Sequence, residues 1–298
     1  MSAPSITIEE LLQTTSRTFA LSIPLLPEPL NHEITLAYLV FRIADTVEDA
    51  DFLGRDQRQR GLHDLCDVLS DLDADSIEQW TRTWADKPIS DNDDYNRLMR
   101  ETPRVLSLVR ELPASSRRII VNHASRSATG MAAVLAEADQ QGRLQLQNLQ
   151  ALQDYCYYVA GIVGELITEL FVTGRYSPSE VATLFETAAA FGEALQLVNI
   201  LKDSAADRIC GRAYLPAGVP IEDVFELARQ DLIEAGRYVE ALRNLNAPPG
   251  FIAFCDAPLQ LADATLRVVE ANGPGSKVPR EETLSLLQQV MAKAGMVD

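Results

Sequence analysis

Hydrophobic residues recur with the spacing of an α-helix along most of the chain. Leu36, Leu39, Val40, Ile43 and Val47 fall at positions i, i+3, i+4, i+7 and i+11, so they share one side of a helix. No segment shows the strict alternation that is typical of a strand. Similar helical stripes run through three later segments, Ile119–Ala138, Leu149–Val172 and Pro178–Ala205.

Clusters of proline and glycine indicate where these helices end. They occur at Pro24–Pro29, Pro113, Gly174–Pro178, Pro216–Pro220, Pro248–Gly250 and Asn272–Pro279. The breaks divide the chain into about eight to ten helices, with no internal repeat and no linker long enough to separate domains. The pattern therefore predicts an all-α fold in which residues 1–298 form a single domain.

The charge balance limits the partners of the chain. With 26 Lys and Arg against 43 Asp and Glu, the net charge is −17. Such a chain has no general attraction for nucleic acid or anionic lipid, and it carries no basic aromatic patch typical of RNA-binding modules. An anionic ligand must be held locally, by metal ions or a few placed cations.

Several features favour a cytoplasmic protein. The four cysteines are scattered without CxxC or Cys/His clustering, which favours reduced thiols. The N-terminal residues do not resemble a signal peptide, and no run reaches the ~18 apolar residues that a membrane span needs. Peripheral membrane contact remains open, and so does the oligomeric state.

A cation and several carboxylates share one face of the first predicted helix. Tyr38, Arg42, Asp45 and Asp49 are spaced by four, three and four residues, opposite the apolar stripe, and Glu48 lies at their flank. Taken alone, this pattern also fits the solvated face of an amphipathic helix.

A second segment repeats the pattern and favours a metal site. Gln196, Asn199, Asp203 and Asp207 form a polar stripe in an otherwise apolar segment, which is costly unless it faces water or an ion. Two such stripes, if they face each other, form a site for magnesium, which prefers hard oxygen ligands and is usually completed by substrate phosphates. Zinc fits less well, since none of the three histidines is near these motifs.

Magnesium between the stripes would let acidic helices bind a diphosphate and stabilise the charge that develops as it leaves. Manganese could replace it. Four cations could clamp the same group, namely Arg17, Arg42, Lys202 and Arg212. A non-catalytic helical protein that binds divalent ions remains the alternative from another class.

The segment Tyr155–Phe171 carries small residues, Ala160, Gly161 and Gly164, among branched apolar ones. One interpretation is tight helix packing, and the other is the wall of a long apolar cavity that excludes water while a carbocation forms. In such a cavity Tyr155 could stabilise the cation with its ring or move a proton with its hydroxyl.

Four blocks together resemble the squalene/phytoene synthase family, and most closely its bacterial squalene synthases. They are TSRTFALSIPLLP, AYLVFRIADTVEDAD, YCYYVAGIVG and LQLVNILKDSAADRICGRAYLP, and they occur in family order between Thr15 and Pro216. The resemblance implies an isoprenoid (terpenoid) synthase fold, with helices around a central hydrophobic cavity capped by two aspartate-rich motifs.

The resemblance also implies a role for each matching residue. Metal would be held by Asp45, Glu48, Asp49, Asn199, Asp203 and Asp207. Diphosphate would be bound, or its flap shaped, by Ser16, Arg17, Tyr38, Arg42, Gln196 and Arg212, with Lys202 at a position where arginine is common and Phe19 against the substrate. Tyr155 matches the tyrosine of the first half-reaction. Ala206 replaces a glutamate that is usual in the second motif.

The reaction that the resemblance implies joins two farnesyl diphosphates head to head through presqualene diphosphate to squalene, with magnesium and a hydride from NADPH. The alternatives within the family are a dehydrosqualene or phytoene synthase and an enzyme that stops at presqualene diphosphate or forms hydroxysqualene. The sequence leaves these products open.

Overall fold

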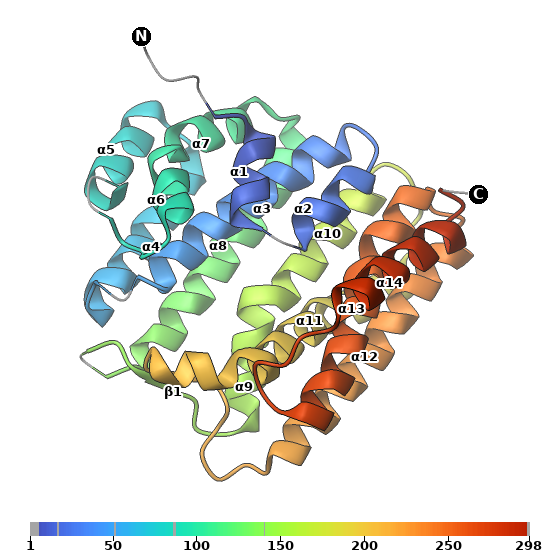
Figure 1. The fold of residues 1–298 in the computed structure, drawn as a ribbon. Helices are drawn as coiled ribbons and strands as arrows, with labels where there is room; N and C mark the ends of the chain where they lie inside the picture. The colour runs from blue at the N-terminus through green and yellow to red at the C-terminus, as the bar shows by residue number, and fades with distance from the viewer. Residues whose placement is uncertain (1–5, 17, 51, 86–87, 140, 297–298) are drawn as a thin grey trace. The chain divides into compact units, whose positions relative to one another are not determined.

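The computed structural model describes residues 6–16, 18–50, 52–85, 88–139 and 141–296. Most of these residues are helical, and their two strands have two residues each (Figure 1). The predicted all-α fold is confirmed. The chain divides into two compact units, residues 1–136 with 140–142 and residues 137–139 with 143–298. The expectation of a single domain stays a prediction.

The first unit is a succession of helices of very different length. It contains α1 (Ile8–Thr15), α2 (Phe19–Ser22), η1 (Ile23–Leu25), α3 (Leu30–Glu48), α4 (Arg55–Asp71), α5 (Ala74–Ala85), α6 (Asp93–Arg100), α7 (Thr102–Glu111) and α8 (Ala114–Ala136). The stretch from α4 to α7 forms more and shorter helices than the sequence pattern predicted, since no proline or glycine cluster marks these breaks. Helix α8 begins directly after Pro113, as expected.

Helix α3 forms the centre of this unit because its apolar stripe is fully enclosed. Leu36, Leu39, Val40, Ile43 and Val47 are all 0% exposed, as the periodicity predicts. Helices α4, α7 and α8 pack against α3. The opposite face of α3, with the polar residues, is thereby held on a rigid element.

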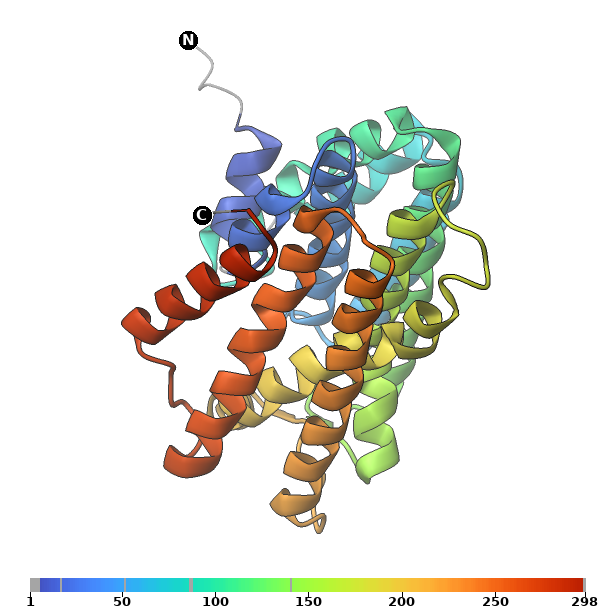
Figure 2. The same cartoon turned by 90° about the vertical axis from the view of Figure 1, so that its right-hand side faces the viewer.

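The second unit is built around the longest helix of the chain. It contains β1 (Leu144–Gln145), α9 (Leu149–Cys156), the π-helical turn η2 (Tyr157–Gly161), α10 (Ile162–Val172), α11 (Ala182–Ile209), β2 (Arg212–Ala213), α12 (Ile221–Asn244), α13 (Pro249–Asn272) and α14 (Arg280–Lys293). Figure 2 shows α12, α13 and α14 side by side. Prolines precede all three of these helices, and α13 ends at Gly273 (φ 87°), as the predicted breaks require.

The small residues of the Tyr155–Phe171 segment permit close packing on α11. A Cβ atom on Gly164 would lie 1.9 Å from the carbonyl oxygen of Ala188, and one on Gly192 would lie 1.9 Å from that of Ala160. Only glycine lets the two backbones approach this closely. The packing interpretation of this segment is therefore confirmed, whereas the cavity wall stays a prediction.

Two helical stretches are long and apolar enough to cross a membrane by length and composition alone, Leu149–Val172 and Ala182–Ile209. In their most apolar windows, 61% and 56% of the residues are buried inside the structure. Such burial is also what the core helices of globular proteins show. The sequence expectation that the chain has no membrane-spanning run stays a prediction.

Candidate active site

Polar side chains of α3 form a connected chain in the first unit. The Tyr38 hydroxyl donates to the carbonyl oxygen of Thr15 at 2.6 Å and accepts from Nε of Arg42 at 3.2 Å. Nη1 of Arg42 lies 3.3 Å from Oδ2 of Asp45. The structure thus brings Tyr38, Arg42 and Asp45 together on one helix face, as their spacing predicts.

The segment between α1 and α2 adds residues of the first sequence block to this face. The backbone N–H of Phe19 donates to Oγ of Ser16 at 3.0 Å. The rings of Phe19 and Tyr38 lie 5.7 Å apart at 48°. Ser16 and Phe19 are therefore held beside Tyr38, while Arg17 lies outside the described residues.

Arg42 is also enclosed by two aromatic rings. Its guanidinium lies 5.5 Å from the ring centre of Tyr38 and 5.6 Å from that of Tyr95, which comes from α6. These contacts hold the cation toward Asp45 and leave it charged. Sequence reasoning missed Tyr95, because nothing in its local pattern connects it with α3.

The Asp45 carboxyl is destabilised in its charged form. Its side chain is 29% exposed. Burial raises its pKa to about 6, Arg42 lowers it and Asp49 raises it further. In the metal-free chain, Asp45 is therefore a site where a bound cation would relieve an electrostatic penalty.

All three carboxylates of the first motif lie in the last turn of α3. Glu48 is the last helical residue and only 6% exposed, and Asp49 caps the helix, with its N–H donating to the Asp45 carbonyl at 2.8 Å. A helix C-terminus carries partial negative charge. At this position the partial negative charge of the helix end adds to that of the carboxylates, so a bound cation would be stabilised by both.

The second motif lies on α11 in the second unit, where a lysine lies against it. Nζ of Lys202 lies 3.0 Å from Oδ1 of Asn199 and 3.2 Å from Oδ2 of Asp203. The Asp203 side chain is 51% exposed and Asn199 is exposed. Gln196 is half-buried one turn earlier on the same helix. This stripe is solvated, whereas the first motif contains the buried Glu48 beside the exposed Asp49.

Tyr155 is held against a tyrosine that the sequence analysis did not select. The rings of Tyr155 and Tyr214 stack 4.6 Å apart at 20°, and Tyr155 is 4% exposed. Tyr214 also lines a small hollow with Asp207. It follows β2 directly, and β2 pairs in parallel with β1 so that Arg212 lies opposite Leu144. The ladder therefore fixes Arg212 and Tyr214 within the unit that carries Tyr155.

Sequence reasoning also missed a group of carboxylates around η2. Burial raises the pKa of Glu193 to about 7, with further contributions from Asp231, Glu165 and Asp154. Burial also raises the pKa of Asp231 to about 6. Their spacing in sequence gives no signal, since they come from four different helices.

The donor types of both motifs fit magnesium. Within the described residues, no three His, Cys, Asp or Glu side chains already form a metal site. Magnesium does not need one, because it usually takes one or two carboxylates and completes its octahedron with water and substrate phosphate. The residues fit this pattern in both units, with carboxylates on α3 and carboxylates and an amide on α11.

The family model for squalene/phytoene synthase matches residues 12–219, which include every residue considered above for the two motifs and Tyr155. The chain belongs to the squalene/phytoene synthase family. The family predicted from the four sequence blocks is thus confirmed.

Curated relatives of the chain include two squalene synthases. The chain is 30% identical to that of Cyberlindnera jadinii over 72% of this chain and 46% of the relative. It is 27% identical to that of Eremothecium gossypii over 88% of this chain and 62% of the relative. The chain therefore spans less than two thirds of the length of these relatives.

Solved structures of squalene synthases share the fold. The complex of TcSQS with the ligand E5700 has a TM-score of 0.78 and 25% identity, covering 96% of this chain and 87% of that one. Squalene synthase HpnC from Alicyclobacillus acidocaldarius has a TM-score of 0.53 and 18% identity, covering 89% and 92%. At that identity the second likeness concerns the fold alone.

Proposed function

We propose that this protein is a prenyltransferase that joins two farnesyl diphosphates head to head, through presqualene diphosphate, to squalene. The observation that carries the proposal is the connected chain of Ser16, Phe19, Tyr38, Arg42 and Asp45 within the family-matched region. It joins an aromatic contact for an isoprenoid, a cation for a phosphate and a carboxylate for a metal. The relatives named squalene synthase support the same assignment.

The acidic residues would hold magnesium, with Asp45, Glu48 and Asp49 from α3 and Asn199, Asp203 and Asp207 from α11. Bound magnesium, or manganese, would neutralise the diphosphate and stabilise the charge that develops on it as it leaves. Lys202 would exchange its contacts with Asn199 and Asp203 for contacts with phosphate oxygens.

The remaining site residues would bind and orient the substrate. Arg42 and Arg212 would donate to the phosphate oxygens, as would Arg17, and Ser16, Tyr38 and Gln196 would supply neutral hydrogen bonds. Phe19 would contact the isoprenoid chain. These roles prepare the allylic C–O bond to break in a site that excludes water.

Tyr155 would act in the first half-reaction. The double bond of the acceptor attacks the allylic cation of the donor, and loss of one proton then closes the cyclopropane, because the electron pair of the broken C–H bond forms the new ring bond. The Tyr155 hydroxyl would move this proton, and its ring would shield the cation. Stacking on Tyr214 supports this role, because it limits the rotation of the ring.

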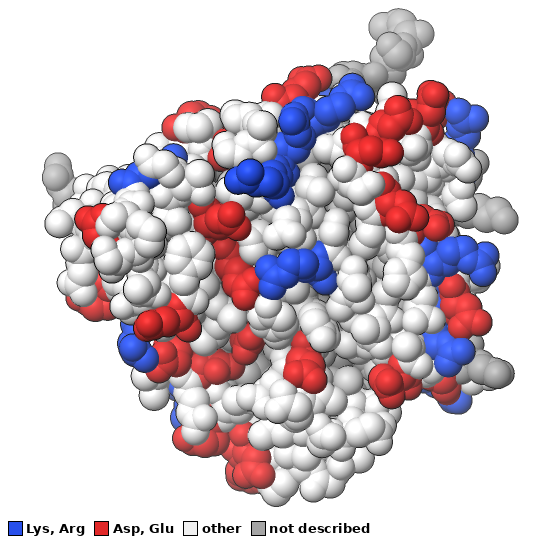
Figure 3. Space-filling view, turned by 180° about the vertical axis from the view of Figure 1, so that it is seen from behind, with Lys and Arg blue, Asp and Glu red and all other residues white. Residues whose placement is uncertain are grey.

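The second ionisation decides the product. NADPH would supply the hydride that ends the rearranged cation as squalene. We further propose a cytoplasmic location with peripheral contact to a membrane for release of the apolar product. On the face drawn in Figure 3, basic side chains form short groups between acidic ones, so this face offers no broad cationic surface to anionic lipid.

The test is product analysis from parallel reactions with and without NADPH. Purified protein is incubated with farnesyl diphosphate and magnesium, and the extracts are analysed by mass spectrometry. Squalene should form only with NADPH, and presqualene diphosphate or unreduced products should accumulate without it. The same dehydrosqualene or hydroxysqualene under both conditions would contradict the squalene assignment, and turnover of geranylgeranyl diphosphate alone would indicate a phytoene synthase.

A further inference from the structure

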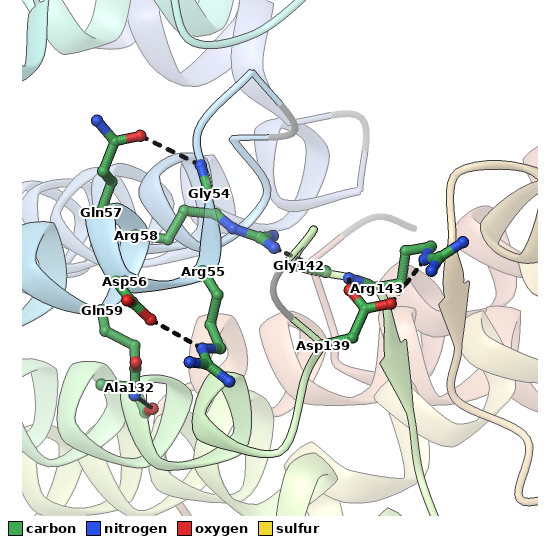
Figure 4. A network of polar contacts seen from close by, with 10 residues as sticks. All are labelled: Gly54, Arg55, Asp56, Gln57, Arg58, Gln59, Ala132, Asp139, Gly142 and Arg143. Carbon is green, nitrogen blue, oxygen red and sulfur yellow. Dashed lines mark hydrogen bonds and ion pairs between the residues drawn. The ribbon is translucent and has the colours of Figure 1, made fainter.

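A buried arginine contacts the turn that carries the first acidic motif. Arg58, in the second turn of α4, is 2% exposed. Its Nη1 donates to the carbonyl oxygen of Glu48 at 2.8 Å, and its Nη2 donates to that of Gly142 at 2.7 Å. Figure 4 shows the side chain reaching from α4 toward Gly142. One planar guanidinium thus joins two backbone segments of the first unit.

The contact with Glu48 lies where α3 lacks hydrogen-bond donors of its own. The last carbonyl groups of a helix have no partner within the helix, and a basic side chain can supply one. Asp45, Glu48 and Asp49 all belong to this last turn. The orientation of their carboxylates therefore depends on how firmly the end of α3 is held.

The contact with Gly142 is closely fitted. Gly142 has φ +78°, which favours glycine, and a Cβ atom there would lie 1.8 Å from Nη2 of Arg58. Neighbouring Gln59 donates to the Ala132 carbonyl at 2.9 Å and fixes α4 on α8 (Figure 4). The position of Arg58 is thus fixed at its backbone, by the packing of α4 on α8, and at its guanidinium, by the close contact with Gly142.

The arginine is costly as a purely structural element. Both of its acceptors are uncharged carbonyl oxygens, and among the described residues its buried Nε has no hydrogen-bond partner. A buried charge without a carboxylate partner opposes folding. Arg58 therefore needs a role that offsets this cost in folding free energy, and its contact with the adjacent acidic turn supplies one.

We propose that Arg58 is a positioning residue of the first acidic motif, which fixes the last turn of α3 so that Asp45, Glu48 and Asp49 present their oxygens to a metal ion. The inference rests on the proposed function. It also predicts whether metal binding becomes weaker or tighter when Arg58 is removed. A nearby positive charge by itself repels a metal ion, so removing Arg58 would tighten metal binding if charge alone mattered. Positioning requires the opposite result.

The test measures binding of Mn²⁺ alone by electron paramagnetic resonance, without substrate. Arg58→Met removes the fork and the charge, and Gly142→Ala displaces the guanidinium while the charge stays. Each should weaken Mn²⁺ binding about 10-fold or more, as loss of a group that orients metal ligands usually does. Arg58→Lys keeps the charge but lacks the planar fork that reaches both carbonyls in fixed directions, and should also weaken binding.

Arg60→Met is the matched control, because Arg60 is an exposed arginine on the same helix. It should leave Mn²⁺ binding unchanged. Variants are compared at wild-type helical content, and if Arg58→Met does not fold, Gly142→Ala and Arg58→Lys carry the test.

Unchanged or tighter Mn²⁺ binding in the folded Arg58→Lys and Gly142→Ala variants would overturn the inference. A wild-type protein that binds no Mn²⁺ and releases no pyrophosphate would overturn the proposed function as well. The two failures are therefore distinguishable.

Discussion

The two acidic motifs have the same type of ligand but different surroundings. On α3, Glu48 is 6% exposed, Asp45 is paired with Arg42 and the helix end is held by Arg58. On α11, Asp203 is 51% exposed and is paired with Lys202, whose side chain is long and flexible. In the first motif Glu48 is buried and the charged form of Asp45 is unfavourable without metal, although Asp49 is exposed. The second motif is solvated.

Because of this difference, mutations in the two motifs should differ in their effect on stability but have the same effect on activity. Removing charge from α3 should relieve an unfavourable interaction in the metal-free protein, whereas the same change on α11 should leave stability nearly unchanged. Both changes should impair catalysis if both motifs act on one diphosphate. The following predictions, from the largest effect to the smallest, can break or sharpen this contrast.

Asp49→Asn and Asp207→Asn should each lower turnover at least ~100-fold, because each removes a carboxylate proposed to hold metal. Thermal stability should be unchanged or raised, because each also removes repulsive negative charge. Steady-state rates and melting curves check this. Asp93→Asn, in an exposed acidic run, is the control and should keep wild-type turnover.

The double variant sharpens the test. If the two motifs act on the same diphosphate, Asp49→Asn with Asp207→Asn should lose much less than the product of the single losses. Variants that unfold but keep their activity per folded molecule would show that these carboxylates are structural.

Tyr155→Phe should slow formation of presqualene diphosphate by about 10- to 1000-fold, because it removes a hydroxyl placed for proton transfer and keeps the ring that stacks on Tyr214. Single-turnover measurements with farnesyl diphosphate check this, with Tyr176→Phe as the control. A wild-type rate in Tyr155→Phe would mean that the hydroxyl is dispensable.

The melting temperature of the metal-free protein should depend on Asp45. Its pKa of about 6 in the folded chain lies above the ordinary value of 3.8, mainly through burial. Between these values the folded chain binds more protons than the unfolded chain, so stability falls as the pH rises from about 4 to above 6. Asp45→Asn should abolish the part of this loss of stability that comes from residue 45.

The comparison with wild type is essential here, because Glu193 and Asp231 also have raised pKa values and contribute a loss of the same sign. Parallel curves for Asp45→Asn and wild type would contradict the electrostatic account of α3.

The sequence predicts the parts of the structure that depend on local spacing. The apolar stripe of α3 and the contact between Arg42 and Asp45 both follow from residues one helical turn apart. The proline breaks before α8, α12, α13 and α14 follow from backbone chemistry that a single residue imposes.

The parts that the sequence does not predict depend on distant contacts. Arg58 and Gly142 are 84 positions apart, and Tyr95 reaches Arg42 from another helix. The π-helical turn η2 has no hydrophobic period of its own. Tyr214 had one available signal, since it lies in the last of the four sequence blocks, but its role depends on stacking against Tyr155.

The central claim is that both acidic faces serve metal-dependent loss of diphosphate. The most direct measurement is release of pyrophosphate from farnesyl diphosphate as magnesium is titrated, with manganese as a second metal and excess EDTA as the blank. The account predicts release with magnesium or manganese and none in EDTA, since acidic faces cannot bind an anion without metal. Equal release in EDTA would contradict the metal role, and no release under any condition would favour a helical protein that only binds divalent ions.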